Sequence, residues 1–137
     1  MQGEEIKAFK NQLRRYNYLC SRMSSLKNSI EYLYDRLGGV RGIDPSKEPV
    51  HVQPNKDLEY KIRDDIEKLE AKLRLVVAEK VEIDEILAKI DPPLRDAIME
   101  VYVYRHRIDV VAIKHSLSHT GLHKRMNKAI KGALREI

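Results

Sequence analysis

The chain has 137 residues, which suffices for one domain or for two small helical units, and it carries a net charge of +5. With 42% hydrophobic residues, 34% charged residues, no Trp and one Phe, the composition favours long solvated helices and argues against a sheet protein. The single Cys20 excludes an internal disulfide, and no apolar run approaches the roughly 18 residues of a membrane-spanning helix, so we expect a cytoplasmic protein without a membrane partner.

The first predicted element is one long helix over residues 4–37. Apolar residues recur there at alternating steps of three and four, the spacing of a helix seam. Gly38 and Gly39 are expected to end this helix, because glycine adopts left-handed conformations easily. The seam consists of Ile6, Phe9, Leu13, Tyr16, Cys20, Met23, Leu26, Ile30, Leu33 and Leu37.

A connector over residues 38–57 separates this helix from a second one. It holds three of the five prolines, and we expect a loop or a short extended piece at residues 50–52. Residues 58–90 then repeat apolar side chains every seven residues, which predicts a coiled-coil-like helix. One row is Ile62, Leu69, Val76, Ile83 and Ile90, and the second row contains Ile66, Leu73 and Leu87.

Two seams of similar length predict a long antiparallel helical hairpin over residues 1–91. The seam residues are explained by packing alone. A seam of this length can also pair between chains, so a homodimer through the hairpin stays open as an alternative.

Residues 92–137 are predicted to form a three-helix helix-turn-helix module. Asp91 is expected to cap its first helix, with Pro92 in the first turn, and Arg105 to Arg107 are placed in that helix's last turn. Asp109 is expected to cap a short helix that ends near Ser116. Ser118 or Thr120 is expected to cap the last helix, which runs to about Arg135.

The predicted motif has the small and aliphatic residues that two closely crossing helices need. Ala112 is the small residue of the first helix, Ser116 lies in the turn, and Leu122 is the buried aliphatic of the second helix. The outer face of that second helix then carries short hydrogen-bonding side chains and cations, the types that contact base edges and phosphates in a major groove. The predicted DNA-binding residues are Ser118, His119, Thr120, His123, Lys124, Arg125, Asn127, Lys128 and Lys131.

The charge distribution supports the same interpretation. From Leu94 to Ile137 Lys and Arg outnumber Asp and Glu by five, which is the net charge of the whole chain. Residues 1–93 are therefore neutral. A basic module joined to a neutral body is typical of proteins that bind polyanions.

The segment from Pro92 to Leu134 resembles the fourth region of bacterial sigma factors. In that region a proline-led helix precedes a helix-turn-helix whose last helix is rich in Arg and Lys. The order of parts, a long helical hairpin followed by this module, is similar to the small phage transcriptional regulators of the RinA/ArpU type. The resemblance implies late-gene activation in a bacterial host cell, with double-stranded DNA as partner. The helical hairpin is expected to supply either dimerisation or contact with RNA polymerase.

Other kinds of site are not expected. His115, His119 and His123 are spaced by four, but the predicted turn separates His115 from the other two, so we predict no metal site. No phosphate loop or nucleophile elbow is present, and we expect neither an enzyme nor a cofactor. The alternative function is a helical scaffold or phage DNA-packaging and assembly factor that binds DNA without sequence preference.

Overall fold

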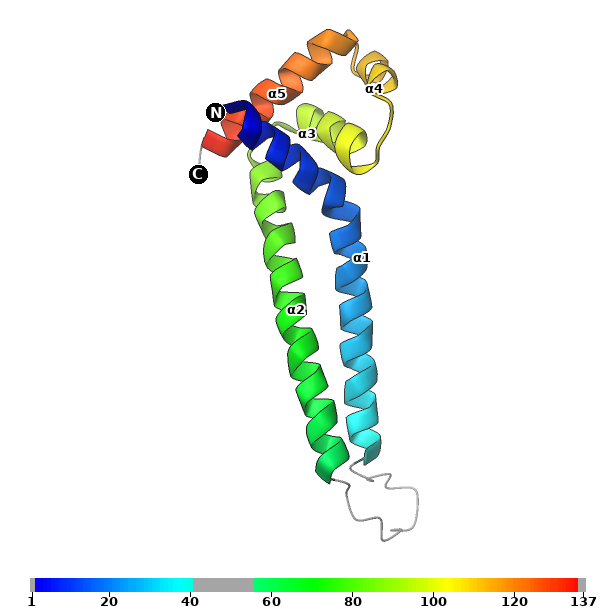
Figure 1. Ribbon diagram of the computed structural model, residues 1–137. Coiled ribbons are helices and arrows are strands. Elements are labelled where there is room, and N and C mark those ends of the chain that lie inside the picture. Colours follow the sequence, from blue (N-terminus) through cyan, green and yellow to red (C-terminus); the bar gives the residue numbers. More distant parts are fainter. Residues whose placement is uncertain (1, 41–55, 136–137) are drawn as a thin grey trace. The chain divides into compact units, whose positions relative to one another are not determined.

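The computed structural model describes residues 2–40 and 56–135, and all its regular elements there are helical (Figure 1). They are α1 (Gln2–Val40), α2 (Lys56–Ala88), α3 (Pro92–Ile98), the π-helical turn η1 (Met99–Val103), α4 (Ile108–Lys114) and α5 (His119–Arg135). The predicted all-α class, with two long helices followed by three short ones, is confirmed for these residues. Most of the predicted connector, including the extended piece at 50–52, lies outside them.

The helices group into two compact units. Unit 1 comprises Met1–Cys20 and Ala78–Ile137, and unit 2 comprises Ser21–Val77. Both long helices contribute to both units. The predicted boundary between residues 91 and 92 divides the chain along its sequence, and it stays a prediction. Contacts in space instead group the start of α1 with the C-terminal helices.

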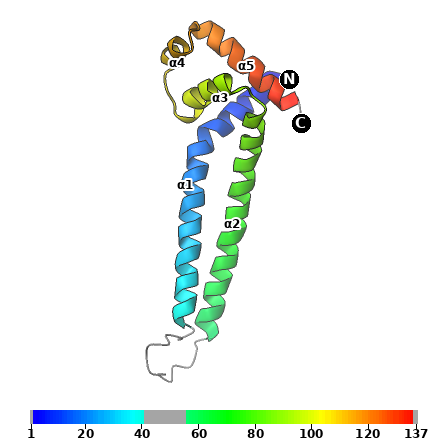
Figure 2. The same ribbon diagram turned by 180° about the vertical axis from the view of Figure 1, so that it is seen from behind.

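In unit 2, α1 and α2 pack side by side in opposite directions, as the views from both sides show (Figure 1 and Figure 2). Their core is formed by Leu37, Ile62 and Ile66, with Ile30, Leu33 and Leu58 partly buried against it. Tyr34 Oη donates a hydrogen bond to Glu70 Oε1 across the two helices at 2.9 Å. The predicted antiparallel hairpin is therefore present here.

The predicted helix stop at Gly38 and Gly39 is wrong. Both glycines lie inside α1, which continues to Val40. A Cβ at either position would meet no neighbouring atom, and neither residue has a positive φ. Glycine is only permissive, since it adopts right-handed helical angles as well as left-handed ones, so a glycine pair does not by itself terminate a helix.

In unit 1, the first half of α1 is fixed against the end of α2 and against η1. Phe9, Leu13 and Leu19 of α1 are almost fully buried, as is Ile83 of α2. Hydrogen bonds join Tyr16 Oη to Asp84 Oδ1 at 2.7 Å and Asn17 Nδ2 to the carbonyl oxygen of Val103 at 3.0 Å. Leu19, and not the predicted Cys20, occupies the seam, since Cys20 is only half-buried.

The helix that starts at Pro92 begins as predicted but ends differently. Asp91 is its N-cap residue, although its side chain makes no capping hydrogen bond, and Pro92 occupies the first turn. The π-helical turn η1 follows, in which Tyr104 N donates to the carbonyl oxygen of Met99, five residues back. The prediction that Arg105 to Arg107 form the helix's last turn is wrong, because they lie after η1.

The wider turn also changes which side chains face the core. A π-helical turn holds more residues than an α-helical one, so the side chains after it are rotated about the axis. Tyr102 and Val103 are buried as a result, while Val101 is half-buried and Tyr104 is exposed.

Candidate nucleic-acid interface

Helices α4 and α5 are joined by a tight turn centred on Ser116. Leu117 N donates to the carbonyl oxygen of Ala112 at 2.8 Å, and Ser116 N donates to that of Ile113 at 3.0 Å. This pair of bonds is a Schellman motif, in which the residue after the helix adopts a left-handed conformation. Ser116 accordingly has a φ of 59°. The turn between α4 and α5 thus has serine at the left-handed position where a helix usually ends in glycine.

The residues beneath this turn are buried as the sequence predicts. Val111 and Ala112 of α4 and Leu122 and Met126 of α5 are at most 1% exposed, whereas Leu117 is half-buried. Ala112 adds little side-chain volume, so α4 and α5 can approach closely. α5 packs against both α3 and α4, which fixes its orientation within unit 1 (Figure 1).

The starts of α4 and α5 differ in how they are capped. Asp109, predicted to cap α4, lies in its first turn, and Arg107 is the N-cap residue. Ser118 caps α5 as predicted, because its Oγ accepts a hydrogen bond from Gly121 N at 2.9 Å. The same Oγ would lie 2.9 Å from a Cβ built on Gly121, so the capped turn leaves little room for a side chain at that position.

The nine predicted DNA-binding residues do not share one face of α5. Seven are exposed, while Asn127 and Lys131 are half-buried. At about 100° per residue, the buried line through Leu122, Met126 and Ile130 defines the inner side of the helix. The positions opposite this line are Thr120, Lys124, Lys128, Lys131 and Arg135, which we call the outer face of α5.

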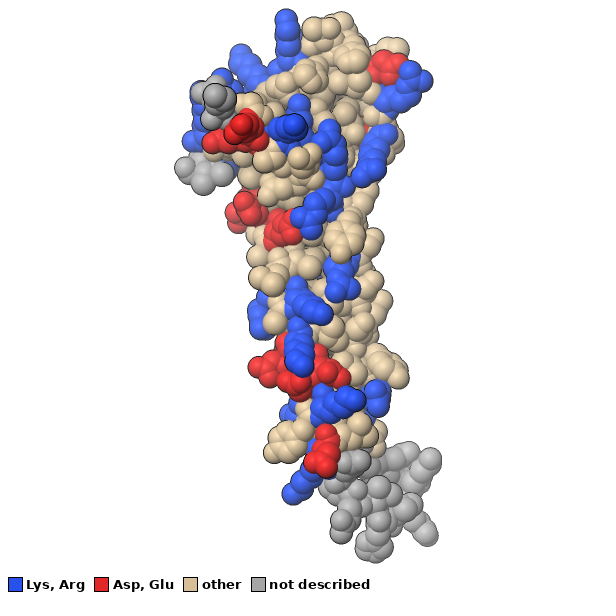
Figure 3. All heavy atoms as spheres, in the orientation of Figure 1, with Lys and Arg blue, Asp and Glu red and all other residues tan. Residues whose placement is uncertain are grey.

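The positive charge of the outer face is not neutralised within the described residues. No ion pair there involves Lys124, Lys128, Lys131 or Arg135. Some cations of the long helices are instead paired with carboxylates, as is Arg15 with Glu79 at 2.7 Å. Further pairs of this kind are Arg63–Glu59, Lys68–Asp64 and Lys80–Asp84. In Figure 3, Lys and Arg side chains project along α5 and along the first part of α1.

His123 and Asn127 lie on one flank of α5 instead of on its outer face. Asn127 Nδ2 is 3.5 Å from His123 Nδ1, and Asn127 Oδ1 is buried without a hydrogen-bond partner in the described part of the chain. Burial first, and then the positive charges of Lys10 and His119, lower the pKa of His123. This flank of α5 therefore faces α1.

The opposite flank carries Arg125. With Lys89 and Lys128 it lines an open pocket of about 320 Å³ whose floor includes Ala129 and Ala133. Asp91 also lines this pocket, so three cations and one carboxylate leave it with a net positive lining beside the outer face.

No family model, curated protein or solved structure matches this chain.

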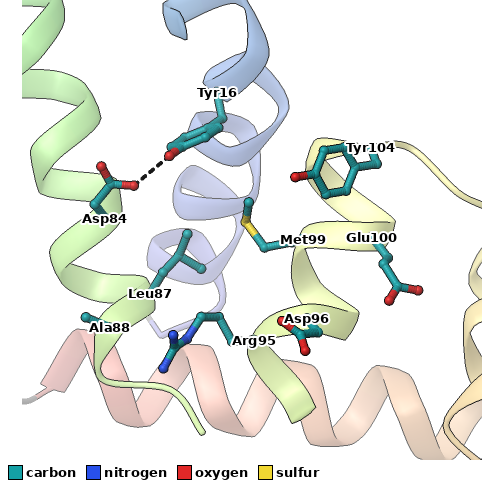
Figure 4. Close-up of a pocket in the computed structure, with 9 residues that line it drawn as sticks. All are labelled: Tyr16, Asp84, Leu87, Ala88, Arg95, Asp96, Met99, Glu100 and Tyr104. Carbon is teal, nitrogen blue, oxygen red and sulfur yellow. Dashed lines mark hydrogen bonds between the residues drawn. The ribbon is translucent and has the colours of Figure 1, made fainter. Parts of the chain in front are cut away.

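The structure also contains a pocket that is chemically unlike the α5 surface. It measures about 410 Å³ and is lined by residues of α1, α2, α3 and η1 with the exposed Tyr104 beside them (Figure 4). Its lining includes three carboxylates and one guanidinium, from Asp84, Asp96, Glu100 and Arg95. An acidic lining repels a polyanion, so we place this pocket outside the nucleic-acid interface.

Most polar groups in that pocket already have partners. Asp84 accepts hydrogen bonds from Tyr16 Oη and from Lys80 Nζ, each at 2.7 Å. Burial, and then the hydrogen bond to Asp84, raise the pKa of Tyr16, and the hydrogen bond to Asp84 raises that of Lys80. Arg95 donates to the carbonyl oxygen of Ile90 at 3.0 Å. These hydrogen bonds hold the elements around the pocket together. A structural role is therefore sufficient to explain the polar residues Tyr16, Asp84 and Arg95.

Two kinds of feature are absent from residues 2–40 and 56–135, the part of the chain that the structure describes. These residues contain no group of three or more His, Cys, Asp or Glu side chains arranged to hold a metal ion. No helix among them has a stretch long and apolar enough to cross a bilayer.

The contribution of α1 to this region is not visible in the sequence. The cations at the start of α1 belong to a segment of low net charge, and the sequence gives no sign that this segment contacts Tyr102 and Val103 of η1. Their spacing, Lys7, Lys10 and Arg14, is visible in the sequence and places them on one line of a helix.

Proposed function

We propose that this chain is a DNA-binding transcriptional regulator whose α5 is the recognition helix. The observation that carries the proposal is the row of unpaired cations on the outer face of α5, directly after a left-handed turn. In helix-turn-helix proteins this helix enters the major groove, and cations beside it contact phosphates.

Contacts to base edges would come from the first half of α5, because recognition helices reach bases with their N-terminal residues. On the outer face these residues are Thr120 and Lys124. His119, His123 and Asn127 would reach a base only from the flank. Ser118 supports the surface indirectly, since its hydroxyl already caps the helix.

The wider biological role is also part of the proposal. The resemblance to RinA/ArpU-type regulators favours a late-gene activator of a phage or prophage that acts in the bacterial cytoplasm. The hairpin formed by α1 and α2 would then supply dimerisation or contact with RNA polymerase.

A second function, a scaffold or packaging factor that binds DNA without sequence preference, is favoured by one observation. Four of the five outer-face residues are Lys or Arg, and the side chains best suited to reading bases, His123 and Asn127, lie on the flank. Cations that contact only phosphates give affinity for DNA without discriminating between base sequences.

Selection from a random DNA pool, followed by footprinting, distinguishes the two functions. A regulator enriches one sequence and protects one discrete site. A packaging factor enriches nothing and retards every duplex alike. Failure to bind any duplex at low salt would refute both.

Variants then test the assigned face. Lys124→Gln and Lys128→Gln should each lower the slope of log affinity against log salt by about 0.9, the value for one phosphate contact. Lys61→Gln, at an exposed position of α2 in unit 2, is the control and should leave the slope unchanged. Fluorescence anisotropy with a labelled duplex measures all three.

A further inference from the structure

The start of α1 carries a basic stripe that unit 1 holds in a fixed place. Lys7, Lys10 and Arg14 follow one another at steps of three and four and so lie along one line of the helix. The adjacent line carries Phe9 and Leu13, which are 1% and 0% exposed. Because this line is buried in unit 1, the position of the stripe relative to α5 is set by packing.

Two cations of this stripe are held by an aromatic ring instead of by carboxylates. Lys10 Nζ lies 5.2 Å from the centroid of the Tyr102 ring, and Arg14 Cζ lies 5.6 Å from it. Tyr102 itself is buried in η1. A cation–π contact orients a cation without cancelling its charge.

The remaining contacts leave both charges uncompensated. Arg14 Nη1 donates to Asn11 Oδ1 at 2.7 Å, and within the described residues neither Lys10 nor Arg14 forms an ion pair. The neighbouring Arg15 is paired with Glu79. Glu79 of α2 therefore neutralises Arg15, whereas Lys10 and Arg14 beside Tyr102 remain available to an anion.

Lys10 also influences α5. Its charge, together with that of His119 and after the effect of burial, lowers the pKa of His123. The basic stripe of α1 and the whole of α5 belong to the same compact unit.

We propose that Lys10, together with Arg14, binds a backbone phosphate of the same DNA that the outer face of α5 contacts. Lys10 Nζ and the Arg14 guanidinium, both beside the Tyr102 ring, would donate hydrogen bonds to the phosphodiester oxygens. The inference rests on the proposed function and extends the interface from α5 to α1, whose sequence lies more than a hundred residues away.

The test compares two lysines on the same helix. Lys10→Gln removes the proposed phosphate contact, and Lys27→Gln removes an exposed lysine of α1 that belongs to unit 2. Anisotropy with a labelled duplex is measured over a series of salt concentrations. Lys10→Gln should lower the salt slope by about 0.9 and weaken binding by about eightfold at 0.1 M salt, and Lys27→Gln should do neither.

Two further measurements separate a lost contact from a lost fold. Lys10→Arg keeps the charge and the contact with the ring, so its slope should match that of the unmodified protein. Circular dichroism should show the same helical content and melting temperature for all three variants. A drop in affinity that Lys10→Arg does not restore would overturn the inference.

The failure of this inference is distinct from that of the proposed function. If Lys124→Gln lowers the salt slope and Lys10→Gln does not, α1 makes no phosphate contact although α5 binds DNA. If the unmodified protein binds no DNA at low salt, both proposals fall together.

Discussion

Replacing Ser116 by glycine should stabilise the protein. Ser116 has a φ of 59°, which costs a residue with a Cβ about 1–2 kcal/mol. Its side chain is exposed and makes no hydrogen bond among the described residues, so its removal loses no contact. Glycine also makes the unfolded chain more flexible, and this effect lowers the free energy of unfolding by about 0.4–1 kcal/mol. The net expectation for Ser116→Gly is a gain of roughly 0.5–1 kcal/mol in the free energy of unfolding.

Thermal and urea denaturation, followed by circular dichroism, measure this difference. For a chain of this size the gain corresponds to a rise in melting temperature of roughly 2–4 °C. Ser25→Gly is the matched control, because Ser25 is exposed in the interior of α1, where glycine is about 0.5 kcal/mol less favourable than serine. The two serine-to-glycine changes should thus have opposite signs. A loss of stability in both would refute the left-handed turn between α4 and α5.

Three other changes test the same region. Leu122→Ala removes a fully buried side chain at the contact of α4 and α5 and should lower the free energy of unfolding by about 2–5 kcal/mol in urea titrations. Ser118→Ala loses the cap of α5 and should cost about 0.5–2 kcal/mol, whereas Ser118→Asp should keep most of the stability. The pKa of His123 is lowered from its ordinary 6.5, so the unfolded chain takes up this proton more readily than the folded one. The free energy of unfolding should therefore fall as the pH drops below about 6.5, and it should fall less in His123→Gln.

The sequence predicts the helices well because their seams are local patterns. The apolar spacing of α1 and α2 and the small residue Ala112 are readable without tertiary information. The structure confirms the two long helices and the burial of Ala112, Phe9 and Ile83. The wrong predictions concern two places where local sequence preferences do not decide the backbone conformation. Glycine at residues 38 and 39 permits a helix end but does not impose one, and the π-helical turn η1 depends on packing that no propensity describes.

The candidate site is less predictable than the fold. Which residues belong to α5 follows from the sequence, but their division between an outer face and two flanks depends on how α5 is rotated against α3 and α4. The nine predicted residues therefore include His123 and Asn127, which face toward α1. The contribution of Lys10 is a tertiary effect, since only the folded chain brings it near His123.

The composition of unit 1 has a consequence for how the protein is made. Its two segments are separated by the whole of unit 2, so residues 1–20 leave the ribosome long before residues 78–135 exist. About sixty further residues must be synthesised before the α2 partners of Phe9, Leu13 and Leu19 exist. Still more must be synthesised before α5 exists. Until then this apolar line is exposed in the nascent chain, where such surfaces are targets for chaperones and for aggregation. A chain truncated inside α2 would thus contain the apolar line of α1 without α3, α4 or α5 to cover it.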